Sequence, residues 1–127
     1  MQAFAKDLTV SLSDDRPGML ARVFEAIYIA HVNVEGYAEV DGTLHVLTRN
    51  ASAARQALAT AGLSTRDERD VLVLDVADRP GVAAAVFRRI ADAGINVQFS
   101  YVGTNNRLVI GSDDTRKIAG LGLGGVA

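Results

Sequence analysis

Two copies of Asp-Arg-Pro-Gly, at residues 15–18 and 78–81, are the part of the chain best suited to bind a small charged molecule. Each copy stands between a β-rich run and an apolar stripe of helical spacing, so its backbone amides would lie at a helix N-terminus. Amides at that position have no partner within the helix and favour an anion such as a carboxylate. Asp15 and Asp78 add acceptors that suit an ammonium group. A carboxylate beside an ammonium is the form of a free amino acid, so the pattern predicts a zwitterion site.

An asparagine follows each copy at the same distance and could complete such a site. Asn33 and Asn96 stand equally far after the two Asp-Arg-Pro-Gly sequences, and a carboxamide offers both a donor and an acceptor. Each residue alone has an ordinary structural explanation, such as a cap or a turn, but the repetition of the whole pattern favours a ligand site. Glycine carries no side chain that would block a ligand. The expected amides belong to Gly18, Met19 and Leu20 and to Gly81, Val82 and Ala83.

The chain is an internal duplication with a unit of about 63 residues. Residues 71–97, aligned without a gap under 8–34, are identical at twelve of twenty-seven positions. A unit of this size buries little surface alone, so we expect the two copies to pack together.

The elements within each copy follow from hydrophobic periodicity and turn signals. Proline suits the first helical position, because its missing N–H would be unpaired there. Asp41-Gly42 predicts a two-residue hairpin turn, and Ala30-His31 and Ala93-Gly94 are the expected helix ends. The expected strands and helices cover residues 8–13, 17–31, 32–40, 43–49, 51–61 and 63–69, and then 71–76, 80–94, 95–103 and 107–111.

This order predicts an α+β protein of two ferredoxin-like β-α-β-β-α-β repeats, each an antiparallel sheet with its helices on one face. We expect one domain at 1–69 and another at 70–127. After the last strand come a short helix at 112–120 and a glycine-rich tail at 120–127. We therefore expect the second repeat to be truncated, without a full fourth strand.

The strand, the Asp-Arg-Pro-Gly loop, the apolar helix and the following Val-Asn-Val or Ile-Asn-Val resemble the ACT domain, a family of small regulatory modules that bind amino acids. The resemblance covers residues 6–69 and, less completely, 70–120. The layout is similar to that of a stand-alone tandem ACT protein with no enzyme domain. It implies a ferredoxin-like fold in which two domains lie side by side and hold the ligand at their seam.

The family's site lies between the loop that opens one first helix and the Asn at the start of the other domain's second strand. Carried onto this sequence, the loop of Asp15 would face Asn96, and the loop of Asp78 would face Asn33. Ser13 would add a hydroxyl to the first of these sites, whereas its counterpart at the second site, Val76, has no hydrogen-bonding side chain. We expect the site with Ser13 and Asp15 to be the more polar one.

The resemblance implies a regulatory module that senses a free amino acid, with no catalytic residues and no cofactor. We expect a homodimer, because unpaired strand edges seek cover. Ligand at the seam would hold two modules in one orientation, and a partner enzyme or regulator would read the change. The alternative is an ACT-like module without ligand that regulates an enzyme or transcription factor through protein contacts. The residues do not identify the amino acid or the partner, nor whether the seam lies within or between chains.

Other functions find less support in the sequence. An acyl-phosphate hydrolase of similar topology needs an arginine and an asparagine, which Arg16 and Asn33 could supply, but the repeat would then give two active sites. RNA-recognition folds need aromatic side chains on a basic sheet, whereas the net charge is −2. We therefore expect no direct contact with nucleic acid.

Metal and membrane roles are not expected either. The chain has no cysteine, and His31 and His45 lie in different elements. We expect His31 to be a solvated helix end and His45 to be a satisfied or exposed strand residue. The N-terminus lacks the apolar core of a signal peptide, and charged residues interrupt every apolar run. A cytoplasmic protein is the expectation.

Overall fold

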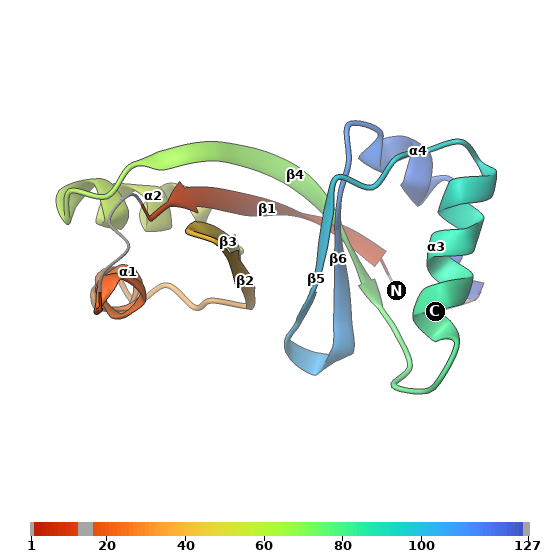
Figure 1. The fold of residues 1–127 in the computed structure, drawn as a ribbon, viewed down its shortest axis with the longest axis horizontal. Helices are drawn as coiled ribbons and strands as arrows, with labels where there is room; N and C mark the ends of the chain where they lie inside the picture. The colour runs from red at the N-terminus through yellow and green to blue at the C-terminus, as the bar shows by residue number, and fades with distance from the viewer. Residues whose placement is uncertain (1, 13–16, 126–127) are drawn as a thin grey trace. The chain divides into compact units, whose positions relative to one another are not determined.

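The computed structural model describes residues 2–12 and 17–125 and divides into two compact units. The first unit is Lys6–Arg69, and the second unit combines Asp70–Ala127 with Met1–Ala5. The expected domains were 1–69 and 70–127, and the difference is that the first five residues group with the second unit. Strands β1 (Gln2–Ser11) and β4 (Thr65–Asp75) are continuous through the places where the chain passes from one unit to the other (Figure 1).

The first unit has a β-α-β-β-α-β order with an antiparallel sheet. Strand β3 pairs with β1 on one side, where Lys6 opposes Thr48, and with β2 on the other. The part of β4 in this unit lies beside β1, where Arg66 Nη1 donates to Ser11 Oγ at 3.3 Å. The elements between β1 and β4 are α1 (Met19–Ile29), β2 (Gly36–Val40), β3 (Thr43–Thr48) and α2 (Ala51–Thr60).

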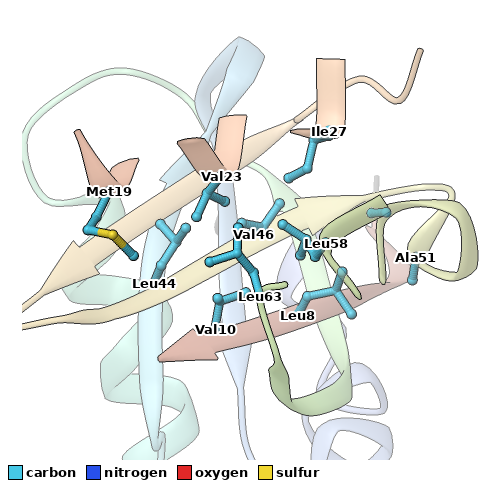
Figure 2. Packing of buried hydrophobic residues seen from close by; sticks show 11 residues of the cluster. Leu8, Val10, Met19, Val23, Ile27, Leu44, Val46, Ala51, Leu58 and Leu63 are labelled. Carbon is cyan, nitrogen blue, oxygen red and sulfur yellow. The ribbon is translucent and has the colours of Figure 1, made fainter. Parts of the chain in front are cut away.

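The core of the first unit forms where its two helices pack on the sheet. Leucine and valine side chains of β1 and β3 meet Met19, Val23 and Ile27 of α1 and Leu58 of α2 (Figure 2). Val23 and Leu58 are completely buried. The apolar stripe of helical spacing is therefore the face that each helix turns to the sheet.

The second unit repeats this plan with β6 as the central strand, paired antiparallel with β4 and β5. Its other elements are α3 (Val82–Asp92), β5 (Phe99–Gly103), β6 (Arg107–Gly111) and α4 (Thr115–Ala119), with short 3-10 segments at Thr104–Asn106 and Leu123–Gly125. The expected short helix near the C-terminus is confirmed as α4. No strand follows β6 in the described part of the chain.

The residues of β1 that group with the second unit contact α4. Gln2 Nε2 donates to Ala119 O at 3.0 Å, and the guanidinium of Arg116 lies 5.7 Å from the centre of the Phe4 ring. Both units combine helices with antiparallel strands, and both therefore belong to the α+β class.

The prediction that proline takes the first helical position is wrong for both α1 and α3. Gly18 and Gly81 occupy the N-cap positions with φ of 93° and 90°, so the helices begin only at Met19 and Val82. A residue with positive φ cannot belong to a right-handed helix, and each proline therefore precedes its helix by two residues.

The expected second strands begin too early. They start at Gly36 and Phe99 rather than at 32 and 95, so Asn33 and Asn96 lie in loops and not in strands. Val32 and Val34 pack partly buried against the first core while Asn33 is exposed. A loop packed on a core shows the same alternation of apolar and polar residues as a strand.

The predicted hairpin turn and helix ends are confirmed. Asp41 and Gly42 have φ of 49° and 83°, as a tight hairpin turn requires. Helix α1 ends at Ile29, followed by His31 with φ of 58°, and α3 ends at Asp92, followed by Gly94 with φ of 75°. His31 is exposed at this helix end, as expected.

Replacing His31 with glycine is expected to stabilise the protein by about 0.5–1 kcal/mol, because glycine adopts positive φ without steric cost. Glycine already occupies the equivalent positions after α2 and α3, at Gly62 and Gly94. Thermal or urea unfolding measures the change. As a control, Ala30→Gly should destabilise, because Ala30 has φ of −80°. A His31→Gly variant that is less stable than the wild type would contradict this account of the helix end.

Candidate ligand site at the two helix mouths

Helices α1 and α3 open with the same backbone geometry, at an exposed glycine in the left-handed region. A methyl group built on Gly18 or Gly81 would meet no atom within 4 Å in the described part of the chain. No described atom therefore obstructs the Cβ direction of either glycine. We call these two helix starts the mouths of α1 and α3.

The mouths differ from the start of α2 in how their amides are satisfied. At α2, Asn50 Oδ1 accepts a hydrogen bond from Ala53 N at 3.3 Å and so caps the helix. Gly18 and Gly81 have no side chain that could do this. The amides of the first helical turn, which have no acceptor within the helix, therefore receive none from the N-cap residue.

The side chains at the mouths divide into buried and exposed ones. Met19 and Val82 are 8% and 5% exposed and belong to the hydrophobic interior, so they can offer a ligand only their backbone amides. Leu20 and Ala83, one residue later, are exposed and could touch a ligand directly.

Of the acidic residues Asp15 and Asp78 in the two loops, the structure describes only Asp78. Asp78 is exposed beside the mouth of α3. Ser13 and Asp15 lie outside the described residues, so the expected polar difference between the sites stays a prediction. Val76, the counterpart of Ser13, is half-buried against the core of the second unit.

The asparagines lie at the opposite ends of the helices from the mouths. Helix α1 has 11 residues, which corresponds to a length of about 16 Å. Asn33 follows its C-terminal end and Gly18 precedes its N-terminal end, and Asn96 and Gly81 have the same relation to α3. Both asparagines are exposed. One unit alone therefore cannot bring its mouth and its asparagine to the same ligand.

A buried polar cluster in the first unit was not expected from the sequence. Asp7 is completely buried, and its carboxylate accepts a hydrogen bond from Thr9 Oγ1 at 3.2 Å. His45 Nδ1 lies 3.1 Å from Asp7 Oδ1. The prediction of a satisfied strand histidine is therefore confirmed for His45. The signal for this cluster in the sequence is Asp7 itself, a carboxylate directly before the apolar run that begins at Leu8.

The residues that the structure describes contain no group of three or more His, Asp or Glu side chains that could hold a metal ion. Among the same residues, no helix has both the length and the apolar character needed to cross a bilayer.

The second copy of the repeat matches a known protein family. Residues 71–116 match the family model of the ACT domain. A 61-residue stretch of the chain is 38% identical to the aspartokinase of Corynebacterium glutamicum. That match covers 48% of this chain and 14% of the aspartokinase.

Solved structures share the fold over almost the whole chain. A protein of Bacteroides thetaiotaomicron superposes with a TM-score of 0.80 at 23% identity, covering 94% of this chain and 87% of that one. The regulatory subunit of aspartate kinase from Thermus flavus gives a TM-score of 0.70 at 20% identity, covering 98% and 94%. With the family match, these likenesses confirm the resemblance predicted from the repeated motif: residues 71–116 match the ACT family model, and the chain shares its fold with these solved structures.

Proposed function

We propose that this protein is a regulatory module that binds a free amino acid where a mouth of one ACT-type unit meets the asparagine of another. The observation that carries the proposal is the duplicated helix start, with an exposed glycine at φ of 93° and 90° whose Cβ direction no described atom obstructs. The match to the ACT family and the shared fold of aspartate kinase regulatory subunits support a regulatory rather than a catalytic role.

The proposed ligand contacts follow from the chemistry of each group. The ligand carboxylate accepts hydrogen bonds from the amides of Gly18 to Leu20, or of Gly81 to Ala83. Its ammonium group faces Asp15 or Asp78. The carboxamide of Asn96 serves the first mouth and that of Asn33 serves the second, each from the opposite unit. The site with Ser13 is the more polar of the two.

Regulation then follows from linkage. An amino acid that binds only when a mouth and an asparagine are held together favours that arrangement of the units. A partner enzyme or regulator that prefers the same arrangement binds more tightly when the amino acid is present, and the coupling is reciprocal. We propose a homodimer as the assembly in which the units meet.

A thermal-shift screen against the twenty amino acids tests the proposal. An amino acid present at about 100 times its dissociation constant should stabilise the protein by about 2.7 kcal/mol. The expected result is a clear rise in the melting temperature with one amino acid or a few related ones. No shift with any of the twenty, at concentrations up to about 10 mM, would contradict the proposal.

A ligand-free interaction module is the second candidate. Tyr28, Ile29 and Val40 of the first unit are large apolar side chains that are 75%, 74% and 69% exposed, and such side chains could contact a partner protein. A negative screen together with a partner protein whose binding is lost in a Tyr28→Ser variant would favour this function.

A further inference from the structure

The loop that carries each candidate asparagine is anchored to its sheet by the same backbone hydrogen bond. In the first unit Glu35 N donates to Leu47 O at 2.8 Å, and in the second unit Gln98 N donates to Gly111 O at 2.9 Å. Each donor stands two residues after the asparagine. The two loops therefore approach their central strands in the same way.

A side-chain hydrogen bond joins the same two positions in both units. Arg49 Nε donates to Glu35 Oε1 at 3.1 Å, and Gln98 Nε2 donates to Asp113 Oδ2 at 2.9 Å. Arg49 and Asp113 each stand two residues after the carbonyl acceptor on the central strand. The position is kept while the chemistry changes: the loop residue is a carboxylate in the first unit and an amide in the second.

The second loop has a further anchor directly on its asparagine. Ser112 Oγ donates to Asn96 O at 2.7 Å, and Ser112 is only 6% exposed. Thr48 has the equivalent place in the first unit, and its hydroxyl oxygen accepts from Asn50 N at 3.2 Å. The backbone of Asn96 is therefore fixed by a buried hydroxyl.

The two side-chain pairs differ in charge and burial. The Glu35 side chain is 10% exposed, whereas that of Arg49 is 82% exposed. A carboxylate this deeply buried depends on its partners, and a largely exposed guanidinium is screened by salt. The pair of Gln98 and Asp113 contains one charge, so salt weakens it less.

We infer that Glu35–Arg49 and Gln98–Asp113 are positioning pairs, which fix the loop two residues after each asparagine and thereby aim its carboxamide at an amino acid bound by the opposite unit. The inference rests on the proposed function. None of the four side chains needs to touch the ligand. The site that uses Asn33 therefore becomes more sensitive to ionic strength than the site that uses Asn96.

The test isolates the Asn33 site in an Asn96→Ala background and uses the L-amino acid that gives the largest thermal shift in the panel of twenty. Arg49→Ala should weaken its binding about fivefold at low salt. A Glu35→Gln, Arg49→Asp double variant rebuilds the pair of the second unit, and should restore the affinity. Its affinity should also change less between about 50 mM and about 500 mM NaCl than the affinity of the parent with the Glu35–Arg49 pair. Calorimetry measures both effects.

Hydrogen exchange of amides 33–36 in the ligand-free protein gives a second readout. Arg49→Ala should speed exchange there, and the double variant should slow it again. Unchanged exchange in Arg49→Ala, or a double variant that does not regain the affinity, would overturn the inference. Failure of the proposed function is recognised separately, because the wild-type protein would then bind none of the twenty amino acids whatever the exchange shows.

Discussion

Replacing Gly81 with alanine is expected to weaken amino-acid binding at the mouth of α3 by roughly tenfold or more. A methyl group on Gly81 would meet no described atom, and we expect it to obstruct the proposed carboxylate at the amides of Val82 and Ala83. Because φ at Gly81 is 90°, the change also strains the backbone by about 1 kcal/mol. Isothermal titration calorimetry measures the loss, and thermal unfolding measures the strain.

Gly94 provides a matched control at the other end of the same helix. It also has positive φ, of 75°, and a methyl group there would also meet no atom within 4 Å in the described residues. Gly94→Ala should therefore lose as much stability as Gly81→Ala and keep the affinity. Equal loss of binding in both variants would show that strain, and not obstruction of the mouth, is responsible, and would contradict the assignment.

Replacing Gly111 with alanine is expected to destabilise the protein by about 1–3 kcal/mol, the range seen when a packed interior receives an extra group. Gly111 on β6 is paired with Phe99 on β5, whose ring lies across it. A methyl group on Gly111 would stand 2.2 Å from Phe99 Cζ, so the ring would have to move. Urea unfolding measures the change in the free energy of unfolding.

Two further variants separate this clash from a general effect of alanine. Gly124→Ala, where a methyl group would meet no described atom within 4 Å, should change stability by less than about 0.5 kcal/mol. In a Phe99→Ala background, Gly111→Ala should cost much less than in the wild type, because the ring is gone. Additive losses in that double variant would show that the ring and the glycine do not depend on each other.

The first unit has the same large and small pair with the strands exchanged. There Gly36 of β2 opposes Leu47 of β3, whereas in the second unit the large residue, Phe99, is on the edge strand. Alignment of the two copies shows a glycine lost at one position and gained at another. Only the strand register shows that the large and the small residue face each other across the strand pair in both units.

Local features of the fold could be predicted because their causes are local. Asp41-Gly42 and Gly94 occupy positions of positive φ that few other residues tolerate, so the turn and the end of α3 follow from residue type. The predicted start of the helices is wrong because Pro-Gly is compatible both with a first helical turn and with a loop before it. The conformation of Gly18 and Gly81 decides between the two.

Features that depend on distant residues could not be predicted. A charged residue is almost never fully buried unless it is paired, and the partners of Asp7 come partly from β3, at His45. Contacts of residues 2–5 with α4 join the two ends of the chain. The composite ligand site stays a prediction for the same reason, since each mouth needs an asparagine from another unit.

A crystal structure with the amino acid selected by the thermal-shift panel is the most direct test of the central claim. The account predicts density for the ligand at a mouth, with its carboxylate against the amides of Gly18 to Leu20 or Gly81 to Ala83. It also predicts the carboxamide of Asn96 or Asn33, from the opposite unit, within hydrogen-bond distance of the same molecule. A ligand bound elsewhere, or mouths filled by side chains while both carboxamides face water, would contradict it.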